Sequence, residues 1–272
     1  PHLAVAREHR VDLAGPRLLG DVDANPADRA VLAGPGGGTG LGADMAQGFA
    51  REGARVWIAG RTPATLESVA ANHPEIRAVE TDVTDETSVE AMFDFIDTPD
   101  VVIANAGSSA SAPFARTTLA DWQAMIDVNL TGTFLTLRAG LKRLKNAPWG
   151  RLIAVASTAG LKGYAYVAPY AAAKHGVVGM IRSLALETAR SGITANALCP
   201  GFLDTEMTER SIANITAKTG MSAEEARANL AGNSPQHRLI RPEEVTAAAL
   251  WLCGPGSEGV TGQAISISGG EV

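Results

Sequence analysis

Tyr170 and Lys174 are the pair best suited to acid–base chemistry, because they stand four positions apart in a segment whose pattern predicts a helix. Side chains at this spacing share one face of a helix. A phenol has a pKa of about 10, which suits proton transfer near neutrality poorly. A nearby ammonium favours the phenolate and is expected to lower that pKa. The spacing predicts either a catalytic tyrosine with its lysine or an ordinary surface pair, since it also arises by chance.

Ser157 favours the catalytic interpretation. It stands at the end of a predicted strand, shortly before the helix that carries the pair. A serine hydroxyl in that place can hold a carbonyl oxygen while Tyr170 moves the proton.

A glycine-rich turn at 34–42 separates a predicted strand from a predicted helix. Glycine permits positive φ and lets the backbone approach a phosphate closely. The helix N-terminus then presents free N–H groups and the positive end of its dipole to that anion. A glycine cluster alone is weak evidence, but its place in the first strand–turn–helix unit predicts dinucleotide binding. The expected contacts are Gly36, Gly38, Thr39, Gly40 and Leu41.

The end of the second strand bears on which dinucleotide binds. An NAD site usually places a carboxylate about 20 residues after the glycine turn. Here the strand runs into Arg61 and Thr62 instead. A guanidinium and a hydroxyl suit a 2′-phosphate, which favours NADP(H). The alternative is NAD(H), with Arg61 a solvated surface residue.

Alternating strands and helices must position these residues. Short β-branched runs alternate with longer helical patterns, which predicts an α/β fold with a parallel sheet covered on both faces. Pro63 indicates a helix start after Thr62, and Thr87 to Glu90 has capping-box spacing that would open another helix. Seven strands are expected at 29–34, 55–59, 76–80, 101–104, 152–156, 194–198 and 264–267, and the longer helices at 41–52, 118–145, 168–191 and 242–253.

Two segments depart from this alternation. Residues 202–241 are too long for an ordinary connection and contain two short helical patterns, the second capped at Ser222 to Glu225. Such an insertion beyond the C-terminal end of a strand is more often a substrate lid than a linker. Residues 1–28 are expected to form an N-terminal extension, either a surface tail or an arm over an interface or pocket. The single catalytic domain is expected at 29–272.

The run Tyr170-Ala171-Ala172-Ala173-Lys174, with Ser157 thirteen residues upstream, resembles the short-chain dehydrogenase/reductase (SDR) family. The glycine loop resembles that family too. The resemblance extends from about residue 29 to the C-terminus and implies a Rossmann-type, doubly wound sheet. The remaining motifs, in chain order, are Asp82-Val83, Asn105-Ala106-Gly107, Asn129 and Pro200-Gly201 followed by Thr205.

The resemblance implies a role for each of these residues. Tyr170 is the proton donor or acceptor, and Ser157 orients the substrate oxygen. Lys174 binds the nicotinamide ribose and tunes Tyr170, while Asn129 anchors a water in the proton relay. The implied cofactor contacts run from the adenine through the adenosine ribose to the nicotinamide: Asp82, Val83, Asn105, Ala106, Gly107, Pro200, Gly201, Leu203 and Thr205. A homotetramer is also implied.

The substrate is indicated only at the level of a subfamily. Residues 156–160 and 168–179 resemble ketoreductases of 3-oxoacyl thioesters, polyketide-type reductases included, whereas 261–264 and 268–271 resemble 3-hydroxyacyl-CoA dehydrogenases. The leading hypothesis is an NADP(H)-dependent enzyme that interconverts a small-molecule ketone and a secondary alcohol, free or linked to CoA or a carrier protein. The alternatives are an NAD-dependent 3-hydroxyacyl-CoA or other alcohol dehydrogenase, and a nucleotide sensor without catalysis.

Two surfaces of the predicted helices leave alternatives open. Apolar residues of the lid could line an acyl pocket or pack the lid down. A basic run could receive a CoA phosphate or an acidic carrier protein, although a solvated helix face is favoured. That run consists of Arg138, Lys142, Arg143 and Lys145.

Composition excludes several other classes of protein. The chain has 272 residues and a net charge of −6, without the basic excess typical of nucleic-acid binding. Hydrophobic residues make up 46%, enough for a sizeable core. Cys199 and Cys253 are the two cysteines, and no cluster of ligating residues has metal spacing, so we expect a metal-independent enzyme. No apolar stretch reaches the roughly 18 residues of a membrane span, and a cytoplasmic location is expected.

Overall fold

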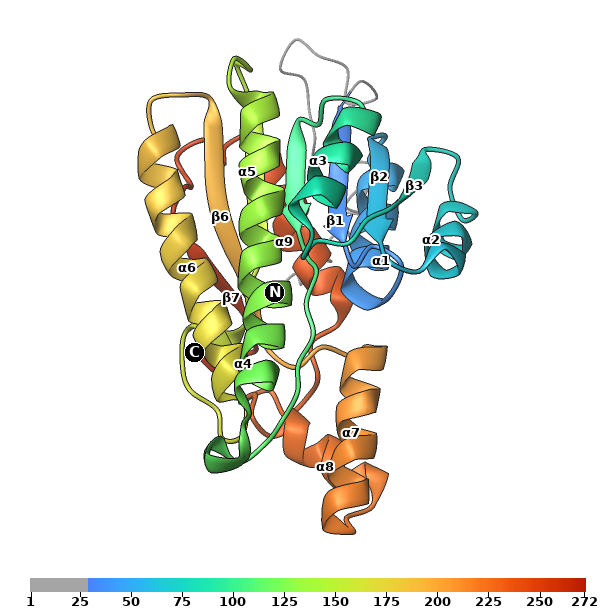
Figure 1. The fold of residues 1–272 in the computed structure, drawn as a ribbon, viewed down its shortest axis with the longest axis vertical. Helices are drawn as coiled ribbons and strands as arrows, with labels where there is room; N and C mark the ends of the chain where they lie inside the picture. The colour runs from blue at the N-terminus through green and yellow to red at the C-terminus, as the bar shows by residue number, and fades with distance from the viewer. Residues whose placement is uncertain (1–28) are drawn as a thin grey trace, which may run out of the picture.

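The computed structural model describes residues 29–272, except for the side chains of residues 33–35. The expected extension 1–28 lies outside the described residues. The described chain contains a seven-stranded parallel sheet in the order β3-β2-β1-β4-β5-β6-β7. The chain builds outward from β1 in one direction and from β4 in the other, so the strand order reverses between these two (Figure 1). This confirms the doubly wound α/β fold, in which ligands bind at the carboxyl ends of the strands near that reversal.

The strands lie within one or two residues of their predicted places. β4 and β5 are buried along their whole length, as expected for central strands covered on both faces. Their bounds are Ala30–Pro35 for β1, Arg55–Gly60 for β2, Ile76–Glu80 for β3, Val101–Ala104 for β4, Gly150–Val155 for β5, Ile193–Pro200 for β6 and Ala264–Ile267 for β7.

Two hydrophobic cores lie on opposite faces of the sheet, because successive strand residues point to opposite sides. Val31 and Val101 face one core, which contains side chains of α1 (Gly40–Arg51) and α9 (Pro242–Cys253). Leu32 and Val102 face the other. The helices on that second face are α3 (Glu86–Phe95), α5 (Gly132–Leu144) and α6 (Ala168–Thr188).

The long helix expected at 118–145 is interrupted. The structure has α4 (Leu119–Ile126), then a π-helical turn at Asp127–Thr131, then α5. The wider turn brings Asn129 to a fully buried position, with its backbone carbonyl accepting a hydrogen bond from the Thr133 hydroxyl at 2.9 Å. Single π turns inside helices occur often at functional sites, and this one contains a predicted catalytic residue.

Helix starts show one wrong prediction and one confirmed one. The capping box expected at Thr87 to Glu90 is absent, because Asp85 caps α3 and accepts the Thr87 N–H at 2.9 Å. The box at Ser222 and Glu225 is confirmed, with both reciprocal hydrogen bonds formed. Thr62 precedes α2 (Pro63–Ala70) with Pro63 in the first turn, but its side chain makes no capping bond.

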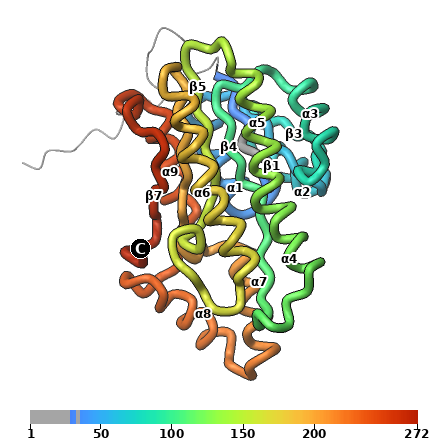
Figure 2. Tube along the Cα trace, turned by 60° about the vertical axis from the view of Figure 1, so that its left-hand side comes forward, coloured from blue at the N-terminus to red at the C-terminus, as the bar shows by residue number. Residues whose placement is uncertain are grey.

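The segment 202–241 carries two short helices, α7 (Glu206–Thr219) and α8 (Ala223–Ala231). They extend beyond the sheet at one end of the molecule, and Figure 2 places the C-terminus near the same end. Ile212 is buried and packs the segment, whereas Met207 and Met221 are exposed. Ile212 therefore packs the segment down, and the use of the exposed methionines stays a prediction.

Candidate active site

Ser157 lies just beyond β5 and begins a short 3-10 turn at Thr158–Gly160. Its Oγ accepts the Ala159 N–H at 3.1 Å. Because that contact uses the oxygen as an acceptor, the hydroxyl proton can be donated to a neighbouring oxygen, that of Tyr170 or of a substrate. Tyr170, in the first turn of α6, is close enough for a hydrogen bond with Ser157 to affect its pKa.

The pKa of Tyr170 is raised above its usual value, chiefly because burial disfavours the phenolate. The hydrogen bond with Ser157 acts against this shift, and Cys199 adds to it. The expectation that Lys174 would lower this pKa is therefore wrong for this structure. Tyr170 is held as a neutral phenol, which is the form that donates a proton.

Lys174 is buried, and its Nζ donates to the Val155 carbonyl at 2.8 Å. Nζ lies 5.7 Å from the centroid of the Tyr170 ring. Burial lowers the pKa of Lys174 to about 8, so the ammonium persists at neutral pH. An ammonium has three donors, so Lys174 retains donors beyond the Val155 bond for hydroxyl groups of a ligand.

Asn129 is tied to the loop that follows β4. Its Nδ2 donates to the carbonyls of Ser108 at 2.9 Å and Met125 at 3.0 Å, and its Oδ1 accepts the Ser108 N–H at 3.3 Å. A Cβ built on Gly107 would lie 3.0 Å from Asn129 Oδ1 and 3.6 Å from Lys174 Nζ. Gly107 therefore adjoins both side chains, and the structure brings Asn129, Ser157, Tyr170 and Lys174 together.

The glycine turn has a close-packed backbone and leads into the N-terminus of α1. Gly36 and Gly40 have φ of 95° and 51°, and a Cβ on Gly42 would lie only 2.2 Å from the Gly36 carbonyl oxygen. Thr39 is the N-cap of α1 and makes no side-chain capping bond. The first N–H groups of a helix lack intrahelical partners, so this turn can receive an anion. Asn105 Nδ2 donates to the Gly36 carbonyl at 3.4 Å, which connects the end of β4 to the turn.

The predicted cofactor contacts differ in how deeply they are buried. Gly38 packs against α2, where its Cβ would lie 2.6 Å from Thr65 Oγ1, and Leu41 and Val83 are buried core residues. Ala106 lies between Asn105 and Gly107 and is partly exposed.

Asp82 and Arg61, two predicted cofactor contacts, carry opposite charges. Asp82 accepts hydrogen bonds from the Thr84 N–H at 2.9 Å and the Thr84 hydroxyl at 2.7 Å, which lower the pKa of its carboxyl. Arg61 contributes to the same shift, so it lies near Asp82. Arg61 and Thr62 are both exposed. Within the described residues Arg61 forms no salt bridge, which leaves its guanidinium able to bind an external anion.

The segment after β6 returns to the glycine turn. Pro200 ends β6, Gly201 follows, and Leu203 forms a parallel bridge with Ile240. A Cβ on Gly40 would lie 3.4 Å from the Thr205 side chain, so Thr205 lies beside the turn.

Sequence reasoning missed three residues beside this site. Tyr164, Lys162 and Glu271 form a polar cluster next to the serine turn. A glutamate in the last two residues of a chain carries no signal of burial, and only the fold brings it to the site.

Comparisons with known proteins agree with this geometry. A family model described as "Enoyl-(Acyl carrier protein) reductase" matches residues 36–271. The chain belongs to the short-chain dehydrogenase/reductase family. A 3-oxoacyl-(acyl-carrier-protein) reductase of Aquifex aeolicus is 32% identical, over 85% of this chain and 92% of its own. A D-beta-hydroxybutyrate dehydrogenase of Cupriavidus necator is 33% identical, over 87% of this chain and 95% of its own.

A solved SDR structure has the same fold. It is a variant of the actinorhodin polyketide ketoreductase with NADPH, with a TM-score of 0.87 and 32% identity. The match covers 91% of this chain and 98% of that one. The chain is therefore an oxidoreductase of the SDR family, which acts on ketone and alcohol groups with a nicotinamide dinucleotide.

Two features of other protein classes are absent from residues 29–272. No helix there combines the length and the apolar character that a bilayer crossing requires. No group of three or more His, Cys, Asp and Glu side chains in that part of the chain is arranged to hold a metal ion.

Proposed function

We propose that this SDR enzyme reduces a ketone to a secondary alcohol with NADPH and that Tyr170 supplies the proton. The observation that carries the proposal is the neutral phenol of Tyr170 within hydrogen-bond reach of Ser157, with the buried Lys174 beside its ring. When bound, the nicotinamide supplies the hydride to the carbonyl carbon. At neutral pH the Tyr170 phenol carries the proton that reduction of a ketone requires.

The four clustered residues divide the work. Ser157 donates its proton to the substrate carbonyl oxygen and fixes its position, while Tyr170 transfers a proton to that oxygen as negative charge develops on it. Lys174 holds ribose hydroxyls with the donors that Val155 leaves free. Asn129 orders the loop at Ser108 and holds a water through which Tyr170 is reprotonated. Oxidation of an alcohol would use the same groups in reverse.

NADPH is preferred in this proposal because of Arg61. Its exposed guanidinium, with the Thr62 hydroxyl beside it, stands where the second strand ends and suits a 2′-phosphate. The remaining contacts are assigned as the sequence predicts, with Asp82 and Val83 at the adenine and Thr205 at the nicotinamide end.

A 3-oxoacyl thioester or polyketide-like ketone is the proposed substrate. The carrier-protein reductase and the polyketide ketoreductase to which the chain is similar support this class. We assign catalysis to residues 29–272 and the substrate lid to 202–241, where exposed Met207 and Met221 can contact an acyl chain. The basic run of α5 is not assigned to carrier docking, because three of its side chains form ion pairs with α3: Arg138 with Glu86, Lys142 with Glu90 and Arg143 with Asp94.

A second candidate is oxidation of a 3-hydroxyacyl compound with NAD. It is favoured by the similarity to the D-beta-hydroxybutyrate dehydrogenase. The two candidates differ in cofactor and direction, so one set of assays separates them.

The test is the oxidation of NADPH by the purified enzyme with acetoacetyl-CoA, followed by the loss of reduced-nicotinamide absorbance. We expect turnover that Tyr170→Phe lowers by about 10³-fold or more while NADPH still binds. NADH replaces NADPH in a parallel assay, and 3-hydroxybutyryl-CoA with NAD tests the second candidate. Bound NADPH without turnover of any ketone would contradict the proposal and favour a nucleotide sensor.

A further inference from the structure

We propose that Glu271 is a positioning residue for catalysis, which fixes the turn of Ser157 through a chain of hydrogen bonds. The proposal rests on the proposed function, because it takes Ser157 to hold the substrate oxygen. Glu271 lies one residue from the end of the chain, on the segment 268–271 that follows β7.

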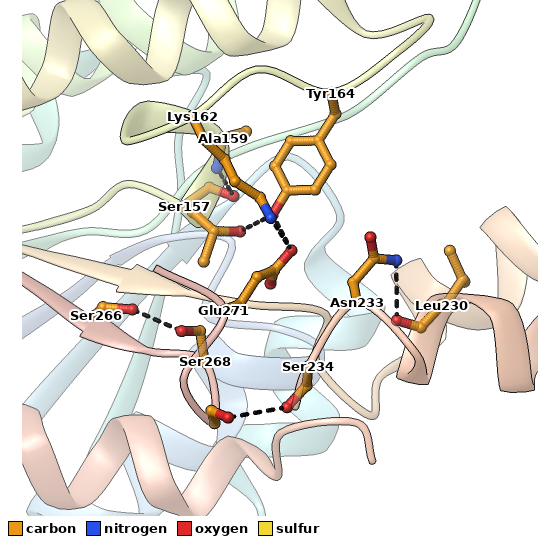
Figure 3. A network of polar contacts seen from close by, with 12 residues as sticks. Ser157, Ala159, Lys162, Tyr164, Leu230, Asn233, Ser234, Ser266, Ser268 and Glu271 are labelled. Atoms are coloured by element: carbon orange, nitrogen blue, oxygen red, sulfur yellow. Dashed lines mark hydrogen bonds and ion pairs between the residues drawn. The ribbon is translucent and has the colours of Figure 1, made fainter. Parts of the chain in front are cut away.

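The Glu271 side chain is only 2% exposed, yet it carries a carboxylate. Two side chains from the loop between Ser157 and Tyr170 contact it (Figure 3). Tyr164 Oη donates to Glu271 Oε1 at 2.5 Å, and Lys162 Nζ lies 3.0 Å from the same oxygen. A buried charge is stable only when it is paired and hydrogen-bonded, so these two contacts fix where the loop must lie.

The hydrogen bonds run in one direction. A tyrosine hydroxyl has a single proton, and Tyr164 gives it to Glu271. The Thr158 hydroxyl, 2.6 Å from Tyr164 Oη, must therefore donate to Tyr164. Burial and the bond to Glu271 both raise the pKa of Tyr164, so it remains a donor across the working pH range. Thr158 is buried and directly follows Ser157, so the chain ends at the catalytic turn.

The same C-terminal segment contacts two other parts of the site. A Cβ on Gly201 would lie 3.3 Å from Glu271 Oε2, which places Glu271 against the turn that follows β6. A Cβ on Gly270 would lie 3.5 Å from Pro235, near the end of the lid. Tyr164 packs edge-on against Phe202, with ring centroids 6.1 Å apart. The serine turn, the turn after β6 and the lid therefore meet at this segment.

Interrupting the hydrogen bonds between Glu271 and Thr158 should lower kcat more than it weakens the binding of NADPH. Loss of the chain leaves Lys162 and Tyr164 without their carboxylate and lets the serine turn shift. A serine hydroxyl displaced by about 1 Å from the developing oxyanion lowers kcat by up to 10²-fold. Within the described residues the Tyr164 hydroxyl bonds to Thr158 and Glu271 and not to the glycine turn, Arg61 or Gly201. Tyr164→Phe should therefore preserve NADPH affinity, whereas Glu271 also adjoins Gly201.

The experiment compares Tyr164→Phe, Glu271→Ala and the double variant. Each single variant is expected to lower kcat about tenfold. The double variant should lower kcat no more than the more damaging single variant, because both substitutions interrupt the same series of hydrogen bonds. Glu271→Gln keeps an acceptor for Tyr164 and should remain within about threefold of the native kcat. The control is Ser266→Ala, which removes a hydroxyl that lies 2.7 Å from the Ser268 hydroxyl. Ser266 is close to Glu271 in the sequence but is not part of the series of hydrogen bonds from Glu271 to Thr158. This variant should leave kcat unchanged.

A second readout needs no turnover. Amide hydrogen exchange over residues 158–164 should accelerate about tenfold or more in Glu271→Ala and stay native in Ser266→Ala. Native exchange in Glu271→Ala, or losses in kcat that multiply in the double variant, would overturn the proposal. Accelerated exchange in a protein that binds NADPH but reduces no ketone would instead overturn the proposed function and leave the positioning of the turn supported.

Discussion

At the scale of single residues, Lys174 shows how a functional charge opposes stability. Its pKa of about 8 lies below the usual value of about 10.4, because burial disfavours the ammonium. Below pH 8 the folded state therefore bears the full cost of the buried charge, about 3 kcal/mol. Between pH 8 and 10.4 the unfolded chain binds more protons than the folded one, so the free energy of unfolding rises with pH through that window.

We expect Lys174→Met to stabilise the fold at pH 7 while it abolishes reduction. The gain should be about 1–2 kcal/mol, because the variant avoids the buried charge but leaves the Val155 carbonyl without its donor. Denaturant unfolding at pH 7 and pH 10 measures it, and the difference from the native protein should shrink at pH 10. A variant less stable than the native protein at pH 7 would show that the buried ammonium of Lys174 does not lower the free energy of unfolding.

Arg61 is the residue on which the cofactor proposal depends. A charge-assisted bond to a phosphate contributes about 1.5–3 kcal/mol, so Arg61→Ala should lower kcat/KM for NADPH about tenfold to a hundredfold. The value for NADH should change less than about twofold, because NADH has no 2′-phosphate. Steady-state kinetics with both cofactors measure the ratio. Arg77→Ala, at another exposed arginine on the neighbouring strand, is the control; an unaltered preference in Arg61→Ala would assign the selection elsewhere.

The residues of the site differ in how far the sequence could predict them. Tyr170, Lys174 and the glycine turn are recognisable because local spacing and local conformation determine their roles. The pKa of Tyr170 was predicted with the wrong sign, since burial in the fold raises it more than the hydrogen bond with Ser157 lowers it. Glu271 could not be predicted, because its contact with Tyr164 joins positions more than 100 residues apart.

Among helices and strands too, the features set by local sequence were predicted and the features set by packing were not. The strands and α9 were predicted closely because apolar runs and a helix-starting proline are local signals. The π turn at Asp127–Thr131 was not, because it depends on packing. Gly132 sits so close to Val83 that a Cβ would lie 2.9 Å from it. Asp85 rather than Thr87 caps α3. The backbone conformation of the residues that precede a helix decides which side chain can cap it, and the sequence pattern does not give that conformation.

The glycine turn gives a prediction about an element. Gly42 has no positive φ, but a Cβ there would lie 2.2 Å from the Gly36 carbonyl oxygen, a backbone atom that cannot rotate away. Gly42→Ala must therefore displace the turn or α1. We expect NADPH affinity to fall about tenfold or more and the protein to lose about 1–3 kcal/mol of stability. Fluorescence titration with NADPH and denaturant unfolding measure the two effects.

A matched glycine substitution elsewhere separates the steric clash of the new Cβ from the general effect of replacing glycine. Gly259 is exposed, has no positive φ and has nothing within 4 Å of its Cβ position. Gly259→Ala should leave NADPH binding unchanged. Equal effects of the two substitutions would indicate that the close approach in the turn is not needed for the cofactor.

At the scale of the whole molecule, the site depends on the order of the strands. Asn105, Ser157 and Gly201 follow β4, β5 and β6, which lie side by side in the sheet. Parallel strands end at one edge, so residues about 50 positions apart in the chain meet there. The segment after β7 lies at the same edge, which is why Glu271 reaches the turn that begins at Ser157.

The surface of α4, α5 and α6 supports a prediction about assembly. Figures 1 and 2 show these helices along one side of the molecule. Leu119 on α4 and Leu186 on α6 are 79% and 81% exposed, and Phe134 on α5 is also exposed. Each of these exposed apolar side chains would be removed from water if copies of the chain packed through these helices. The family resemblance implies a homotetramer, so we expect copies of this chain to associate through these helices.

Sedimentation velocity should give a particle four times the mass of the chain. Leu186→Glu and Phe134→Glu should each shift the equilibrium toward dimers or monomers, because a buried carboxylate without a partner opposes association. Phe95→Glu is the control, since Phe95 is also exposed but lies on α3, apart from these three helices. A native monomer would contradict the prediction outright. Dissociation by Phe95→Glu alone would move the interface to α3 and leave the exposed residues of α4 to α6 available for substrate or for another protein.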